Sequence, residues 1–283
     1  MIRDPTQTAY VYEGNFVAIV DPNANDSEIQ LVNLVESETY IQGVVPSEMG
    51  DYWPIETLKS QAVAARTYAW WTVTQVKRGA RPSEYDLDDT VQYQAYLGNS
   101  TRSKVSDSAV TSTNKLVMKY NGEVIKSFFS ADSGGYTESA EHGFTQVLPY
   151  CQSKKELYDV SRTATVWVLN LSLAKISAAL NQTIQRIEVL AGDVDESGRV
   201  LWVTLNGQTK ISGAVFRQKL KLRSTLFQLE LQSDDSIKLS GAGFGHGVGL
   251  AQIGAREYVN QLAWDFEQIV KFYYTGITLE VLN

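Results

Sequence analysis

Residues 43–71, GVVPSEMGDYWPIETLKSQAVAARTYAWW, carry a strong helical pattern. Pro54 suits the first turn of a helix, where an amide hydrogen is not needed. After it, apolar and small residues recur at alternating steps of three and four, which predicts one buried stripe. These positions are Ile55, Leu58, Ala62, Ala65, Ala69, Thr72 and Val76. The small residues predict a closely packed central helix, ended by Gly79 and Pro82.

The approach to this helix carries one carboxylate, Glu48. Residues 36–45 are expected to form a short helix that closes on Pro46, because a proline disfavours helix in the residue before it. Pro46 and Pro54 stiffen the segment, and the ring of Trp53 is expected beside Glu48. A carboxyl group against an aromatic wall has its charged form disfavoured and its pKa raised. A general acid for glycosidic bonds requires such a pKa. The alternative is a solvated charge at a helix end.

The composition is that of a mildly acidic globular protein. Of the 283 residues, 43% are hydrophobic and 20% charged, and the net charge is -7. Without a basic run, the chain is a poor candidate for binding nucleic acid. Its short apolar runs predict no membrane span. The start, MIRDPTQTAY, has no hydrophobic signal core, so the protein is either cytoplasmic or its leader has been removed. The single Cys151 excludes an internal disulfide.

The remaining patterns predict the α+β class. Asn121-Gly122 between two apolar runs indicates a tight hairpin, and residues 104–113 read as a helix with Asn114 as its cap. Strands and helices do not alternate regularly, which argues against a doubly wound parallel sheet. We expect a mixed fold with a central buried helix, mainly antiparallel strands, a β-rich insert and a cleft between them.

The expected domain organisation has three parts. Residues 1–15 form a flexible N-terminal segment. Residues 16–160 and 234–283 form the catalytic core. Residues 161–233 form a β-rich subdomain of the same domain, because they contain successive strand patterns around turn signals.

His246 lies in GAGFGHGVGLAQIGA, residues 241–255, where every second residue from 241 to 249 is glycine. Glycine at this density allows positive φ and lets another chain or a ligand approach the backbone closely. A helix is expected to begin near Val248, with its free N–H groups facing the loop. The leading strand and later acidic residue of the dinucleotide fingerprint are missing. We therefore expect a ligand-facing loop with a positioned histidine, and the alternative is a structural turn.

Three other patterns carry weaker signals. His142 and Cys151 lie nine residues apart, but a chain with one Cys and two His would need carboxylates to complete a zinc site. We predict no metal site. Ser133 precedes two glycines, which suits a turn better than the elbow of a nucleophilic serine. The segment GDVDESG, residues 192–198, resembles the start of a calcium loop, but Thr204 stands where a bidentate Glu is needed. We expect a hairpin turn there.

Five motifs in order resemble the stage II sporulation protein D family, which includes the amidase enhancer LytB. They are GVVPSEMGDYWPIETLKSQAVAARTYA, DTVQYQAYLG, FFSADSGGYTESAE, ISGAVFRQKLKLRSTLFQL and GAGFGHGVGLAQIGA with a later YYTG. The resemblance covers nearly the whole chain. It implies a peptidoglycan lytic transglycosylase, which cuts between N-acetylmuramic acid and N-acetylglucosamine and leaves 1,6-anhydromuramic ends. The family's catalytic glutamate lies in the PSEM motif, which is Glu48 here.

The resemblance also implies a mechanism and a set of substrate-binding residues. The C6 hydroxyl of muramic acid attacks the anomeric carbon, so Glu48 acts first as acid and then as base, and one carboxylate suffices. Other matching residues are expected to bind substrate, shape loops or brace Glu48. They are Gln61, Arg66, Tyr68, Gln94, Tyr96, Ser133, Tyr136, His246 and Gln252. The catalytic carboxylate is expected to share a cleft with Tyr68, Ser133 and His246.

The implied partners are peptidoglycan glycan strands, preferably stripped of peptides, and a cell-wall amidase. The implied location is outside the cytoplasm. Some family members carry zinc, but one Cys and two His do not support it here, so no cofactor is expected. Two other functions stay open. One is a wall-binding module that recruits an amidase without cutting, and the other is a hydrolase that uses His246 with Ser133 or a metal.

Overall fold

A computed structural model describes residues 10–20, 29–79, 84–90, 93–162, 165–232 and 235–282. The chain forms two compact units. The first takes in the chain up to Ser127, residues 265–267 and the chain from Ile277 onward. The second takes in residues 128–264 and 268–276. Both units mix helices with small sheets, which confirms the α+β class.

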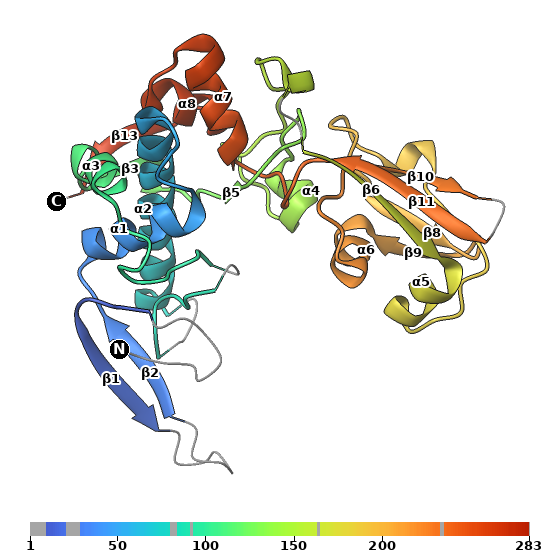
Figure 1. Cartoon of the computed structure of the whole chain (residues 1–283), viewed down its shortest axis with the longest axis horizontal. Coiled ribbons are helices and arrows are strands. Elements are labelled where there is room, and N and C mark those ends of the chain that lie inside the picture. The colour runs from blue at the N-terminus through green and yellow to red at the C-terminus, as the bar shows by residue number, and fades with distance from the viewer. Residues whose placement is uncertain are drawn as a thin grey trace. The chain divides into compact units, whose positions relative to one another are not determined.

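The first unit contains three helices and two small antiparallel sheets among its described residues. The helices are α1 (Ser37–Glu48), α2 (Ile55–Lys77) and α3 (Lys104–Ser112). The strands are β1 (Asn15–Val20), β2 (Ile29–Leu34), β3 (Leu116–Tyr120), β4 (Glu123–Val124) and β13 (Thr278–Val281). Helices α1 and α3 pack against α2 and against each other (Figure 1). Strand β3 packs on α2 and pairs with β13 and β4, while β1 and β2 form a separate hairpin.

Helix α2 is the central buried helix that the sequence predicts. Residues 57–67 are buried on every side of the helix except at Lys59, so the buried surface is wider than a single stripe. The Thr67 hydroxyl donates to the Val63 carbonyl at 2.6 Å and accepts the Met118 N–H at 3.0 Å. This side chain therefore bonds β3 directly to the helix. None of the described helices is both long enough and apolar enough to cross a lipid bilayer.

Helix α1 does not end at Val45, as the sequence predicts, but continues through Pro46 to Glu48. A proline removes a single donor from a helix, and here it lies in the last turn, where little helix follows it. The hydroxyl of Ser47 donates to the carbonyl of Gly43 at 2.7 Å, which adds a bond in this turn. Glu48 is consequently the last residue of a helix.

Two local predictions in this unit can be compared with the structure. The hairpin between β3 and β4 is confirmed, and its turn residues Asn121 and Gly122 have φ angles of 51° and 82°. Helix α3 begins after a Ser103 capping box, as its sequence pattern allows. Its C-cap is Thr113, one residue before the predicted Asn114. Residues 1–9 of the expected flexible segment lie outside the described residues.

The second unit contains the remaining elements. Its helices are α4 (Ala140–Phe144), α5 (Leu173–Leu180), α6 (Gly213–Leu220), α7 (Gln252–Leu262) and most of α8 (Phe266–Tyr273). Short 3-10 turns cover Val160–Arg162 and Ala191–Asp193. Its strands are β5 (Phe129–Ser130), β6 (Val166–Ser172), β7 (Ile187–Glu188), β8 (Trp202–Leu205), β9 (Thr209–Ser212), β10 (Phe227–Leu231), β11 (Ser236–Ala242) and β12 (Leu250–Ala251). Sheets β10-β11-β6 and β7-β8-β9 are antiparallel, and β12 pairs with β5 in parallel.

The β-rich segment of this unit has a hydrophobic core of its own. Ile176, Val203, Phe216 and Ile237 have no exposed surface and belong to one cluster of packed side chains. Strand β11 is the middle strand of its sheet, so this core extends beyond the predicted boundary at residue 233. The segment belongs to the same compact unit as residues 128–160. Its standing as a separate subdomain stays a prediction.

Candidate active site

Glu48, the last residue of α1, is half-buried and held by a distant part of the chain. Its Oε1 accepts the backbone N–H of Ala95 at 2.7 Å. Two residues later, the N–H of Leu97 donates to Ser47 Oγ at 3.3 Å. Residues 95–97 therefore run along the last turn of α1. Folding joins two motifs that stand 47 residues apart in the sequence.

Two tyrosine rings lie beside this contact. The centroids of Tyr40 and Tyr96 are 4.8 Å apart. Gln94 Nε2 donates to Tyr40 Oη at 3.4 Å, and Tyr96 Oη donates to Asn33 Oδ1 at 3.3 Å. A Cβ atom at Gly43 would lie 2.5 Å from the ring of Tyr96, so only glycine lets this ring pack against α1. The predicted residues Gln94 and Tyr96 are therefore part of the Glu48 neighbourhood, and both are buried.

The electrostatics of this cluster keep Tyr40 protonated. Burial raises the pKa of Tyr40, and smaller contributions come from Tyr96, Glu48 and Tyr68. Tyr40 is thus a neutral hydrogen-bonding group at ordinary pH. The contact expected between the ring of Trp53 and the carboxylate of Glu48 stays a prediction.

Arg66 and Gln61 lie inside the first unit, on the buried part of α2. Arg66 is 3% exposed and binds both carboxylate oxygens of Glu38 at 2.7 Å. The same guanidinium donates to the carbonyls of Val110 and Leu116. Gln61 has no exposed surface. Arg66 therefore ties α1 to α3 and β3, which fits the expected bracing of Glu48 better than contact with a substrate.

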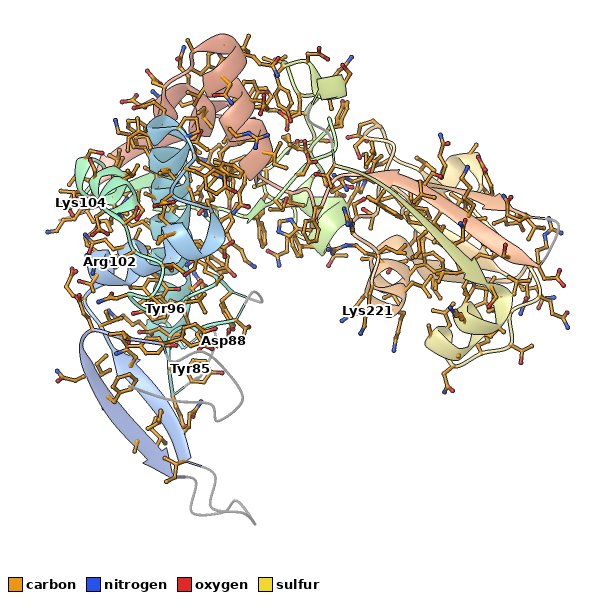
Figure 2. All side chains as sticks on the ribbon, in the orientation of Figure 1. Tyr85, Asp88, Tyr96, Arg102, Lys104 and Lys221 are labelled. Carbon is orange, nitrogen blue, oxygen red and sulfur yellow. The ribbon has the colours of Figure 1, made fainter. Side chains whose placement is uncertain are left out.

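A pocket of about 910 Å³ also lies in the first unit. Tyr40, Arg66 and Tyr96 line it together with other residues of the unit. Figure 2 labels Tyr85, Asp88 and Tyr96, all of which belong to this lining. Glu48 is not among the described residues that line the pocket. Tyr40 and Tyr96 therefore belong both to the neighbourhood of Glu48 and to the lining of the pocket.

In the second unit, Ser133 is a buried anchor. Its Oγ donates to Glu156 Oε1 at 2.7 Å and accepts the N–H of Gly135 at 3.2 Å. The hydroxyls of Tyr258 and Tyr273 also donate to Glu156, at 2.8 Å and 3.2 Å. Burial raises the pKa of Glu156 to about 7. Since Ser133 has no exposed surface, its geometry fits a loop-shaping role. No local sequence pattern marks Glu156, because its partners come from distant segments.

His246 is held by its own glycine loop and by two aromatic rings. Its Nδ1 accepts the N–H of Val248 at 3.0 Å. Its ring meets those of Phe144 and Phe128 edge-on, with centroid distances of 4.9 Å and 5.9 Å. The ring is therefore positioned, as the sequence predicts, and Nδ1 serves as an acceptor.

The environment of His246 makes it a weak base. Burial lowers its pKa to about 3, and the positive charges of Arg217 and Arg199 act in the same direction. The imidazole is consequently neutral at ordinary pH, far from the range of an efficient general base. Its Nδ1 is engaged by the loop, and the hydroxyl of Ser133 is engaged by Glu156. These contacts do not favour a Ser–His hydrolase.

The glycine loop adopts the backbone geometry that its sequence suggests. Glycines 243, 245, 247 and 249 all have positive φ, between 71° and 111°. A side chain at Gly249 would overlap the carbonyl of Phe128, so the close approach of the two segments requires glycine at this position. The predicted helix start near Val248 is wrong, because positive φ is incompatible with a right-handed helix. Strand β12 intervenes, and α7 begins at Gln252, which is buried.

Tyr136 is half-buried and forms a β-bridge with Lys155. Like Ser133, His246 and Gln252, it belongs to the second unit. Tyr68 is half-buried on α2 in the first unit. The expected cleft that would bring these side chains to Glu48 stays a prediction.

Comparison with known proteins identifies the family. A family model described as stage II sporulation protein matches residues 25–120. A model for a domain of unknown function matches residues 102–249. The first match contains Glu48, Gln61, Arg66, Gln94 and Tyr96, so it covers the neighbourhood of Glu48.

Several relatives match over most of the chain. Stage II sporulation protein D of Bacillus subtilis is 31% identical over 260 residues, which cover 87% of this chain and 75% of the relative. An uncharacterised protein of Brachyspira hyodysenteriae is 34% identical over 266 residues, 92% of this chain and 70% of the relative. The amidase enhancer of Bacillus subtilis is 28% identical over 298 residues, 84% of this chain and 40% of the relative. By these matches and by the motifs that its fold brings together, the chain belongs to the stage II sporulation protein D family.

Proposed function

We propose that this protein is a peptidoglycan lytic transglycosylase with Glu48 as its catalytic carboxylate. The observation that carries the proposal is the hydrogen bond between Glu48 and the backbone of Ala95. It holds the carboxylate at the end of a helix whose residues 43–46 are buried. A positioned, half-buried carboxylate beside phenol groups is suited to proton transfer, which depends first on geometry.

The proposed reaction needs only this one acid–base group. Glu48 gives a proton to the glycosidic oxygen while the N–H of Ala95 holds its side chain. The C6 hydroxyl of the muramic acid attacks the anomeric carbon as the bond to the leaving sugar breaks. Glu48 then takes the C6 hydroxyl proton, so the carboxyl group ends as it began. The products are an anhydromuramic end and a free sugar hydroxyl, and no water is consumed.

The substrate class follows from the same surroundings. Tyrosine rings offer apolar faces and polar edges, which suit the rings and hydroxyls of a sugar. The chain carries a net charge of -7, which disfavours the carboxylates of stem peptides and agrees with peptide-stripped glycan. A glycan substrate places the protein in a cell-wall role outside the cytoplasm, with a cell-wall amidase as the partner that strips the peptides.

A second candidate function is a non-catalytic module that binds the wall and recruits or enhances an amidase. The similarity to a protein named amidase enhancer favours it. The two candidates would use the same binding residues and differ in whether the glycan is cut.

Digestion of amidase-treated glycan strands, read by mass spectrometry, tests the proposal. Wild-type protein is expected to release fragments with anhydromuramic ends, and the Glu48→Gln protein is expected to release none. Equal release by both proteins would exclude the role of Glu48. Binding of the strands by both proteins, without any cleavage, would favour the second candidate.

A further inference from the structure

A second cluster of ionisable groups lies in the second unit, apart from the residues assigned to catalysis. It consists of Glu138, His142 and Asp195. One donor atom from each residue lies within 4.8 Å of the other two. His142 Nδ1 is 3.4 Å from Asp195 Oδ2 and 3.6 Å from Glu138 Oε1. The imidazole nitrogen thus faces two carboxylate oxygens from different segments.

The two oxygens of the Asp195 carboxylate have different surroundings, and only Oδ2 faces this cluster. Its Oδ1 accepts three hydrogen bonds, from the N–H and Oγ of Ser197 and from the N–H of Arg199. These bonds fix the side chain, which is 1% exposed. Its buried Oδ2 has no N–H or hydroxyl donor among the described residues and points to His142. A buried carboxylate oxygen without such a donor is costly, and a cation held between this oxygen and His142 would satisfy it.

The spacing of the donors fits a small divalent cation. Tetrahedral zinc binds nitrogen and oxygen at about 2.0–2.2 Å, which puts neighbouring ligand atoms about 3.4 Å apart. The two distances from His142 Nδ1, 3.4 Å and 3.6 Å, match this edge length. Calcium and magnesium prefer oxygen ligands, whereas an imidazole with carboxylates suits zinc and its transition-metal neighbours.

We infer that Glu138, His142 and Asp195 form a binding site for a divalent transition-metal ion, with Zn²⁺ as the best match to the donor set. Three protein ligands leave a fourth position for water. His142 is 33% exposed and gives the ion a route from solvent, while the two carboxylates form the buried floor.

The charges around the cluster are compatible with a cation. Arg199 is the buried positive group that faces both carboxylates. Its Nη2 donates to the carbonyls of Ser133 and Tyr136 and its Nη1 to Thr225 Oγ1, so both of these nitrogens are engaged by groups outside the cluster. When both are ionised, the adjacent buried carboxylates of Glu138 and Asp195 repel each other. A bound cation removes this repulsion.

The ion would join two segments that are distant in the sequence. His142 lies in α4 and Glu138 just before it, whereas Asp195 lies in the turn between the bridged residues Val194 and Val200. This turn belongs to the β-rich segment. A metal at this point clamps that segment to the α4 region, so we expect a structural role, with stabilisation of the second unit on binding.

Zinc titration of the full chain, prepared without a polyhistidine tag and treated with a chelator, tests the inference. Calorimetry is expected to show one strong Zn²⁺ site per chain, and the melting temperature is expected to rise with added Zn²⁺. Substitutions Asp195→Asn and His142→Gln are expected to weaken binding at least about tenfold. Glu141→Gln, an exposed carboxylate next to His142 with the same change of charge as Asp195→Asn, should bind as the wild type does.

Co²⁺ supplies a readout that does not depend on stability. Visible absorption typical of a tetrahedral site is expected in the wild type and in Glu141→Gln, and is expected to be lost in His142→Gln. His142 is partly exposed, so this variant should fold even if Asp195→Asn does not. Equal zinc binding by wild type and His142→Gln would overturn the site. A melting temperature that responds to Ca²⁺ and not to Zn²⁺ would overturn the choice of metal.

Discussion

The carboxylate of Glu48 accepts the backbone N–H of Ala95 at 2.7 Å, across 47 residues of sequence. The donor belongs to the backbone, so a side-chain truncation cannot remove it, but a proline at position 95 would, because proline has no backbone N–H. We expect Ala95→Pro to lower the rate of glycan cleavage about 100-fold, because a misplaced catalytic group costs about this factor. Ala95→Gly keeps the N–H and should stay within a few-fold of the wild type. Anhydro-end release over time measures both, and equal rates would argue against the positioning role.

Glu48→Gln is expected to abolish cleavage while the protein keeps its fold. The amide oxygen of glutamine can still accept the N–H of Ala95, but the side chain can neither give nor take a proton. Loss of a general acid–base group lowers a rate by about 10²–10⁴. The melting temperature should change little, and a strongly destabilised variant would show that the carboxylate has a structural role as well.

Arg66→Met is expected to destabilise the first unit strongly. It removes a guanidinium that is 3% exposed and leaves Glu38 without its bidentate partner, at a cost of about 3–5 kcal/mol in unfolding free energy. The matched control is Arg78→Ala, whose pairing with Glu123 is largely exposed and worth less than about 1 kcal/mol. Chemical denaturation measures both. Similar losses in the two variants would contradict the bracing role.

Glu156→Gln is expected to change how stability depends on pH. The folded pKa of Glu156, about 7, lies above its ordinary value of 4.5. Its contribution to stability is therefore fully present below about pH 4.5 and is lost as the pH rises towards 7. Between pH 5 and 7 the wild type should lose about 2 kcal/mol of unfolding free energy that the variant does not lose. Denaturation curves at both pH values measure this, and parallel pH profiles would contradict it.

His246→Asn is expected to act in the opposite direction. The folded pKa of His246, about 3, lies below its ordinary value of 6.5. The neutral ring thus contributes stability that is fully present above about pH 6.5 and is lost as the pH falls towards 3. Asparagine keeps an acceptor for the N–H of Val248, so the variant should lose less stability on acidification. Unfolding at pH 6.5 and pH 4.5 measures the difference, and an unchanged acid sensitivity would exclude His246 as a cause.

Local sequence patterns were sufficient to predict much of the fold. The spacing of apolar residues predicted α2 as the central helix, and Asn121-Gly122 predicted the hairpin between β3 and β4. The same reasoning misplaced the end of α1 and the start of α7. At Pro46 the preference against helix was outweighed by packing in the last turn, and at Gly249 a close contact with Phe128 fixed a non-helical backbone.

The sequence by itself determined the α+β class, the central helix, the family motifs and Glu48 as the candidate carboxylate. Periodicity and turn chemistry involve residues close together in the chain, so they can be read directly. The tertiary structure alone decided that Ala95 holds Glu48, that Ser133 anchors on Glu156, and that Asp195 faces His142. These contacts join residues 23 to 53 positions apart. They arise only when buried surfaces pack, because packing fixes which distant polar groups meet.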